Sequence, residues 1–224
     1  MAACYTISND RRTFHHGREM YLPDHFSVSD SALIRDVMHA YPFALLICPD
    51  ESGLPYATHV PLVTHDDASG LMLEGHVARA NPHSGLLQAQ QEVLIVFNGP
   101  DAYVSPSLYK TEMAVPTWNY VAVHAYGRPE IVDDRDGKNW LLEKLIDQHE
   151  PAYVEQWHGL PDEYRQKMLA AIVGFRIHVT RLEAKFKLSQ NRPAEDRQRI
   201  YRTFSSAADE PHKELATWMR RLGI

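Results

Sequence analysis

The residues with the clearest chemical potential are the aromatic and amide side chains of Trp118, Asn119 and Tyr120, which open a strand-like run that reaches Gly127. Side chains alternate between the two faces of a strand. We therefore expect two sets on opposite faces: Trp118, Tyr120, Ala122 and His124 on one, and Asn119, Val121, Val123 and Ala125 on the other. The first face could bind a flat ring, but the same side chains could equally fill the interior of a barrel.

Histidine is abundant, yet its spacing does not indicate a metal site. The chain holds thirteen His residues and only two Cys, Cys4 and Cys48. No HExxH or CxxC pattern accompanies them, so no metal ligand set and no disulfide framework are predicted. His76 and His124 lack a neighbouring nucleophile or acid in the sequence, and we interpret both as structural.

The charge of the chain restricts its partners. With a formal net charge of -6 over 224 residues, the whole surface is not expected to grip nucleic acid. A local basic patch remains at Lys185–Arg202 and at Arg220–Arg221, which suits either a solvated helix face or a DNA contact. No apolar run approaches the roughly 20 residues of a membrane span. We expect no membrane association and a cytoplasmic location.

The hydrophobic pattern predicts a mainly β protein with helical insertions. Short apolar or alternating runs predict strands at 43–48, 55–64, 71–77, 93–97, 103–104, 118–132 and 172–182, with a turn at 98–100. Helical spacing or capping residues predict helices near 29–39, 81–90, 137–149 and 161–171. The pattern predicts no second domain: residues 20–224 form one domain, and residues 1–19 form a flexible N-terminal extension.

The C-terminal segment 193–224 is charged and helix-like. Leu215, Trp218, Met219 and Leu222 recur at a spacing that forms one apolar stripe. We expect this stripe to dock on the barrel or on a partner subunit.

Five ordered motifs are more specific than composition: 57–62 (ATHVPL), 75–82 (GHVARANP), 103–106 (YVSP), 115–120 (VPTWNY) and 187–192 (KLSQNR). Together they closely resemble the PaiB family, whose members are described as FMN-binding negative transcriptional regulators. The resemblance implies a six-stranded antiparallel split β-barrel of the pyridoxamine phosphate oxidase type, an α+β fold with peripheral helices. It also implies a homodimer with flavin in the groove between two barrels.

The resemblance also implies a set of flavin-binding residues. Thr58, His59, Gly75, His76, Arg79 and Asn81 occupy the places that hold the FMN phosphate, and Arg79 is the first choice because its fork matches a phosphate. Trp118 and Asn119 stand near the ring, where the Asn119 amide could bond the pyrimidine edge. Lys187, Ser189 and Gln190 could close the ribityl or phosphate end, or form a turn bonded to its own backbone.

Three functions follow from these residues and the resemblance. The first is an FMN-binding protein that acts as a negative transcriptional regulator, with a local basic patch as its DNA contact. The second is an FMN-dependent flavin reductase or oxidase. The third is haem binding, because some split-barrel relatives bind haem and the chain is rich in His.

Overall fold

One antiparallel sheet, curved into a split barrel, organises the protein. The computed structural model describes residues 20–68, 70–90 and 92–224, so the predicted extension 1–19 lies outside the described residues. The strands are β1 (Ser27–Val28), β2 (Phe43–Pro49), β3 (Pro55–Pro61), β4 (Val63–Asp67), β5 (Gly70–Ala78), β6 (Val93–Val104), β7 (Thr117–Val132) and β8 (Ile172–Lys187). Their order is β3-β2-β6-β7-β8-β5-β4, and β1 pairs with β8.

The predicted α+β class with an antiparallel barrel is confirmed, but the predicted count of six strands is too low. The described sheet has eight strands. One addition is β1, whose two residues are too short to give a periodic signal. Another arises at Leu62, which interrupts the strand predicted over 55–64 and whose backbone N–H bonds Pro42 O at 2.9 Å.

The turn predicted at residues 98–100 is a β-bulge inside one long strand. β6 runs through these residues, and its register with β7 shifts between Asn98 and Asp101. Gly99 permits this close approach, since an added Cβ would lie 3.0 Å from the backbone oxygen of Val121. Turn-forming residues therefore bend the strand here without ending it.

Helices cover the ends and edges of the sheet. They are α1 (Ser31–Ala40), α2 (His83–Ala89), α3 (Arg135–His149), α4 (Val154–Gly159), α5 (Asp162–Ala170), α6 (Ala194–Ser205) and α7 (Glu210–Arg221), with short 3-10 turns at Asp24–Phe26, Pro106–Leu108 and Pro151–Tyr153. Asp30 caps α1, because its carboxylate accepts the backbone N–H groups of Ala32 and Leu33. Helix α4 was not predicted; its six residues carry little periodic signal.

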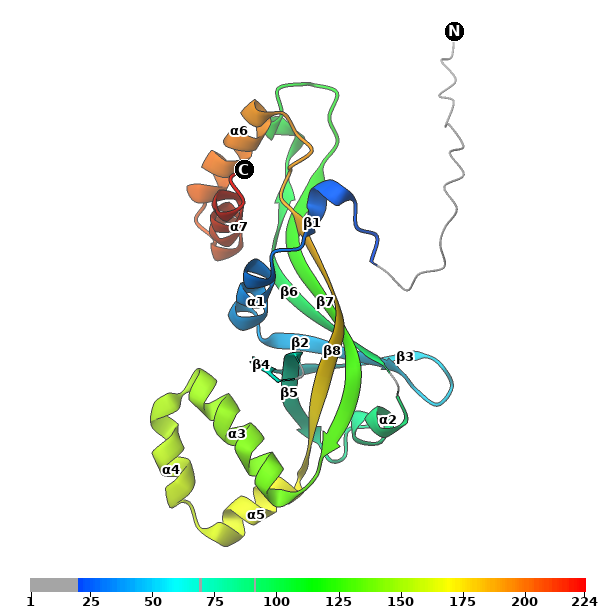
Figure 1. Cartoon of the computed structure of the whole chain (residues 1–224). Coiled ribbons are helices and arrows are strands. Elements are labelled where there is room, and N and C mark those ends of the chain that lie inside the picture. The colour runs from blue at the N-terminus through cyan, green and yellow to red at the C-terminus, as the bar shows by residue number, and fades with distance from the viewer. Residues whose placement is uncertain (1–19, 69, 91) are drawn as a thin grey trace.

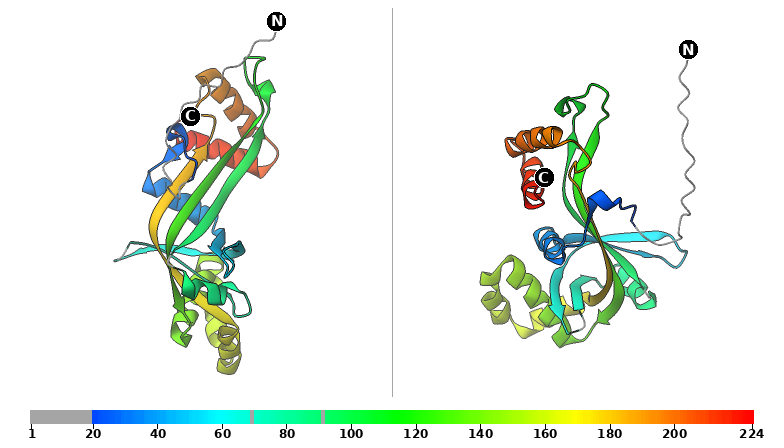
Figure 2. Two further views of the ribbon diagram at one scale, coloured as in Figure 1. Left: turned by 90° about the vertical axis from the view of Figure 1, so that its right-hand side faces the viewer. Right: turned by 45° about the horizontal axis from the view of Figure 1, so that its top comes forward.

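The long strands β7 and β8 connect two ends of the molecule. Figure 1 shows α6 and α7 beside one end and α3, α4 and α5 beside the other, and both views in Figure 2 keep this separation. The expected docking of the C-terminal stripe on the barrel is confirmed. Leu215, Trp218 and Met219 are buried, and the Trp218 ring meets Phe186 of β8 edge-on at 5.4 Å.

Candidate functional site

A polar cluster forms where β3 faces the start of α2. Thr58 Oγ1 lies 2.8 Å from His83 Nδ1 and accepts a hydrogen bond from Asn81 Nδ2 at 3.2 Å. Asn81 Oδ1 in turn accepts the backbone N–H of His83 at 2.9 Å. The structure therefore brings together two of the residues predicted to hold a phosphate, Thr58 and Asn81. We call Thr58, Asn81 and His83 the threonine cluster.

His83 is the member that the sequence analysis missed. Its ring is fully buried, its centroid lies 4.8 Å from that of Tyr56, and its Nε2 has no hydrogen-bond partner. Burial lowers the pKa of His83 below its usual range, which keeps the ring neutral near pH 7. One feature of the sequence could have indicated His83: it directly follows Asn81-Pro82, a pair typical of a helix start. At such a start the Asn side chain bonds a backbone N–H two residues later, which here is that of His83.

A second cluster surrounds a groove of about 460 Å³ at the other end of β7. Aromatic side chains and two lysines line it. Four of the lining residues come from the N-terminal segment (Tyr21, Pro23, His25 and Phe26), and five come from β7 and β8 (Thr117, Trp118, Tyr120, Lys185 and Lys187). We call it the lysine groove. It combines flat apolar walls with fixed positive charge, a composition that suits a flat, electron-rich ring.

Both ammonium groups in the lysine groove are held in place. Lys185, only 8% exposed, donates to Tyr21 O at 2.7 Å and lies 5.1 Å from the Tyr21 ring. Lys187 donates to Thr117 Oγ1 at 2.5 Å and to Trp118 O. Burial lowers the pKa of the Lys187 ammonium, and the nearby charges of Lys185 and Arg192 lower it further.

Asn119, Ser189 and Gln190 support the lysine groove from behind. Asn119 is fully buried, and its Oδ1 accepts a bond from Ser189 Oγ at 3.0 Å. Ser189 adopts a positive φ of 67°, and Gln190 accepts the backbone N–H of Leu188 at 2.7 Å. In this arrangement Asn119 does not line the groove, and its Nδ2 is buried without a hydrogen-bond partner, so the bond from its amide to a ring edge stays a prediction.

The alternation predicted for residues 118–125 is confirmed, and it separates the two clusters. Asn119, Val121, Val123 and Ala125 are buried, whereas Trp118 is 52% exposed. Thr58 pairs with Leu46, Leu46 with Ile95, and Ile95 with Ala125, so Thr58 lies on the buried face of the sheet. Ala125 also lies roughly 23 Å along β7 from Trp118. Thr58 and Trp118 of one chain thus lie on opposite faces and far apart.

The remaining predicted phosphate residues lie elsewhere. His59 turns to the opposite face of β3 from Thr58 and stacks on Phe43 at 5.6 Å. Gly75 packs in the barrel, where an added Cβ would lie 2.8 Å from Leu62 Cδ2. His76, on the other face of β5, is largely buried, and burial lowers its pKa.

Arg79, the first choice for the phosphate, is committed to other groups. Its guanidinium donates to both carboxylate oxygens of Asp133, at 2.5 and 3.1 Å, and to the carbonyl oxygens of Ala170 and Ile172. Asp133 also accepts from Lys138 at 3.0 Å. A phosphate at Arg79 would have to displace this carboxylate. The sequence could not reveal the pairing, because Asp133 is far away in the chain.

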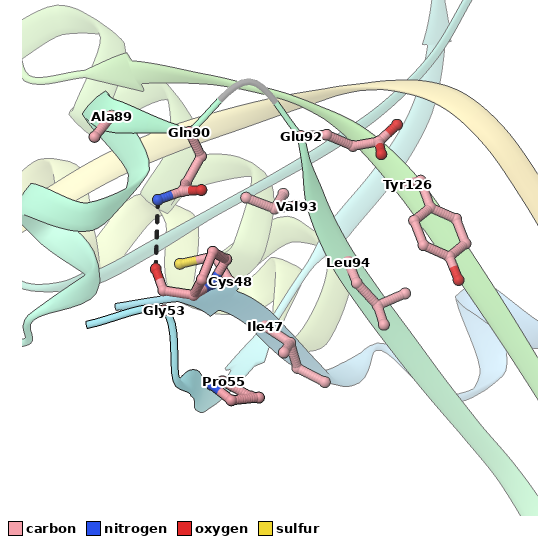
Figure 3. Close-up of a pocket in the computed structure, with 11 residues that line it drawn as sticks. Ile47, Cys48, Gly53, Pro55, Ala89, Gln90, Glu92, Val93, Leu94 and Tyr126 are labelled. Atoms are coloured by element: carbon pink, nitrogen blue, oxygen red, sulfur yellow. Dashed lines mark hydrogen bonds between the residues drawn. The ribbon is translucent and has the colours of Figure 1, made fainter. Parts of the chain in front are cut away.

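An apolar groove of about 530 Å³ lies beside the paired strands β2 and β6 (Figure 3). Ile47 and Cys48 of β2 and Val93 and Leu94 of β6 line it, and Gln90 and Tyr126 flank it. None of the predicted site residues lines this groove.

Two absences concern the described ranges 20–68, 70–90 and 92–224. Within them, no three His, Cys, Asp or Glu side chains gather in a way that could hold a metal ion. No helix there is long and apolar enough to cross a membrane.

Comparison with known proteins identifies the family. Residues 20–181 match the family model described as "Putative FMN-binding domain". The chain is 34% identical over 206 residues to the Bacillus subtilis protein named "Protease synthase and sporulation protein PAI 2", and the match covers 89% of this chain and 96% of that protein. The chain belongs to this FMN-binding family, the PaiB family. The description of the family names FMN as the ligand of this domain, which makes FMN the possible cofactor of the chain.

Solved structures support the same fold. The flavocytochrome Anf3 from Azotobacter vinelandii superposes with a TM-score of 0.59 at 18% identity, covering 76% of this chain and 74% of its own. The FAD and haem binding protein from Mycobacterium smegmatis superposes with a TM-score of 0.59 at 18% identity. The match covers 77% of this chain and 78% of that protein. At this identity the likeness concerns the fold alone.

The residues of this family member fit FMN. The threonine cluster offers hydroxyl and amide groups of the kind that bond a phosphate, and Asn81 and Thr58 are already oriented. The lysine groove offers aromatic walls and two ammonium groups for the ring. Within one chain, however, the threonine cluster and the lysine groove lie too far apart to bind the phosphate and the ring of the same FMN molecule.

Proposed function

We propose that FMN binds between two copies of this chain, with its phosphate at the threonine cluster of one copy and its ring in the lysine groove of the other. The observation that carries the proposal is that Thr58 and Trp118 lie on opposite faces of one sheet. In an isologous dimer, a contact from Thr58 of one copy to Trp118 of the other is repeated by the two-fold symmetry, so two equivalent shared sites form.

Each side chain then has a defined task. Trp118 and Tyr120 provide a surface for the ring, and Lys185 and Lys187 provide positive charge beside it. Asn119 and Ser189 hold the strand end that carries Trp118 and Lys187. When bound, FMN supplies electron or hydride transfer, while the protein sets orientation and electrostatics.

The flavin state would report to gene expression, as expected of a negative transcriptional regulator in the cytoplasm. Support comes from the family and from the name of the Bacillus subtilis relative, which calls it a sporulation protein. The local basic patch at Lys185–Arg202 gives less support for a DNA contact. Lys185 and Lys187 face the lysine groove, Arg192 lies 4.2 Å from the Tyr109 ring, and Arg199 pairs with Glu195. Arg202 and Arg220 are exposed and are the better candidates for a DNA contact.

A mixing experiment tests the shared site. Thr58→Val and Trp118→Ala variants each damage one half of every site in their own homodimers. When the two are mixed and allowed to exchange subunits, half of the dimers are mixed, and each mixed dimer carries one intact site. Flavin titration should then recover roughly a quarter of the wild-type number of tight sites.

The outcomes separate the alternatives. If both halves serve one ligand within a single chain, mixing recovers no tight sites and the shared-site proposal is wrong. Lys213→Ala, an exposed residue outside both clusters, is the control variant and should bind FMN like the wild type. For regulation, a mobility-shift assay on the protein's own upstream DNA that detects no salt-sensitive binding would remove direct repression.

A further inference from the structure

The hydroxyl of Thr58 is surrounded by groups that limit what it can do. Asn81 Oδ1 accepts the backbone N–H of His83, so the amide must turn its Nδ2 toward Thr58. Thr58 Oγ1 therefore already accepts one hydrogen bond. The remaining question is whether His83 Nδ1, 2.8 Å away, donates to Thr58 or accepts from it.

The surroundings of the His83 ring decide this question. A neutral imidazole carries one N–H, and its position depends on the partners of the two nitrogens. Nε2 is buried and has no partner, so a proton there would be an unpaired buried donor. A proton on Nδ1 is paired with Thr58. The Nδ1–H form leaves no ring N–H unpaired and is favoured.

In that form, Thr58 Oγ1 accepts from both Asn81 Nδ2 and His83 Nδ1. Both of its lone pairs are then used, and its own O–H has no acceptor within the cluster. Thr58 is partly exposed, so this O–H can point toward a ligand. We propose that His83 is a positioning residue that makes Thr58 an obligate hydrogen-bond donor and thereby selects an anionic oxygen such as the phosphate of FMN. This inference rests on the proposed function.

The preference of Thr58 for an anionic oxygen follows from the donor and acceptor capacity of its hydroxyl. A threonine hydroxyl normally both donates and accepts, so it tolerates neutral or charged groups of either kind. With its lone pairs occupied, it favours acceptors, and charged acceptors give the stronger bonds. His83 need not touch the ligand to have this effect. It also explains why a fully buried His faces a hydroxyl near a surface cluster.

Comparison of FMN with riboflavin tests the inference, since the two differ in the phosphate. We measure the affinity of each by fluorescence titration and take the ratio as the phosphate contribution. A matched pair of substitutions follows: the amide nitrogen of His83→Asn stands near the position of Nδ1, whereas that of His83→Gln stands near Nε2. Thr58→Val removes the hydroxyl.

We expect His83→Asn to keep the ratio within about threefold of the wild type. His83→Gln should lower it by a few-fold, because a hydroxyl that no longer accepts from His83 Nδ1 can turn its O–H away from the phosphate. Thr58→Val should lower it by about tenfold or more, the size of a lost bond to a charged group, and the double variant should go no further than Thr58→Val, because no hydroxyl remains for residue 83 to orient. A His83→Gln variant that folds, binds riboflavin normally and keeps the wild-type ratio would overturn the inference.

A second measurement does not depend on FMN. Nitrogen-15 NMR of the histidine rings in the wild-type protein reports which nitrogen of His83 carries the proton, with His83→Gln used to assign the signal. The Nδ1–H form is expected, and an Nε2–H form would overturn the inference. If the protein bound neither flavin while the Nδ1–H form was present, the proposed function would fail and the donor role of Thr58 would stand.

Discussion

At the scale of single residues, charged side chains near the candidate site are mostly committed to partners within the fold. Asp133 is the clearest example. Its carboxylate accepts two hydrogen bonds from the Arg79 guanidinium and lies 3.0 Å from Lys138 Nζ. These two cations lower the pKa of Asp133 to about 2. Arg79 thus joins the end of β5 to the segment between β7 and α3, which is a structural task, and its contact with a phosphate stays a prediction.

Replacing Asp133 by Asn should change the acid side of the stability profile. The pKa of Asp133 is about 2 in the folded chain and roughly 3.9 when unfolded, so its carboxylate stabilises the fold above pH 4. This contribution is lost as the pH falls toward 2. The variant should be less stable at pH 7 by no more than about 1 kcal/mol, since the pair is half exposed, and equal to the wild type near pH 2. Urea unfolding at several pH values measures this.

The FMN affinity of Arg79→Ala provides the companion control. If Arg79 acts only through Asp133, FMN and riboflavin should bind this variant with the wild-type ratio. A selective loss of FMN affinity would return Arg79 to the phosphate site.

At the scale of elements, close packing between strands limits where the chain can change. Gly75 lies in β5 beside Leu62, and its neighbours also include Phe175 Cζ at 3.1 Å and Pro61 O at 3.1 Å. An added Cβ would require the Leu62 side chain to move and would lie tightly against Phe175 and the Pro61 carbonyl. Gly75 therefore serves the packing that holds β3 and β5 together, which keeps Thr58 in position.

A pair of glycine substitutions tests this packing role. Gly75→Ala should destabilise the protein by roughly 1–3 kcal/mol, the usual result of adding a group to a full core. Gly85→Ala is the matched control: Gly85 lies in α2 with open space around it, so alanine should stabilise by about 0.5–1 kcal/mol. Urea midpoints compare the two. A neutral Gly75→Ala would mean that the barrel wall yields easily.

At the scale of the whole molecule, the long strands β7 and β8 keep the two clusters apart. The lysine groove lies at the start of β7 beside the N-terminal segment, and the threonine cluster lies where β3 faces the start of α2. A rigid sheet cannot bend to bring them together within one chain. Two copies can meet this requirement, because each presents both faces.

Thermal unfolding should report this coupling. If FMN binds only to the dimer, it should raise the melting temperature, and the rise should shrink on dilution of the protein as dimers separate. At a free FMN concentration of 100 times its dissociation constant, the free energy of unfolding would rise by about 2.7 kcal/mol per site. Riboflavin at the same concentration should stabilise less. A rise that does not depend on protein concentration would favour a site within one chain or a dimer that does not dissociate over the range.

Local patterns were sufficient for much of the fold. The alternation over residues 118–125, a helix over 29–39 and the apolar stripe of α7 were all predicted, because each depends on neighbours within a few residues; the N-cap of that helix is Asp30, one residue after the expected Ser29. The same local signals misled at Asn98–Pro100 and at Leu62. Whether turn-forming residues end a strand or bend it depends on the partner strand, which the sequence does not display.

The motifs in the sequence indicated the family, FMN as the ligand that the family description names, and the chemical types of the candidate site residues. Only the tertiary structure decided which of these residues meet. It placed His83 beside Thr58, paired Arg79 with Asp133, and set Thr58 and Trp118 on opposite faces. The physical reason is that such contacts join residues distant in the chain, and their geometry depends on strand register and burial, which the whole sheet determines together.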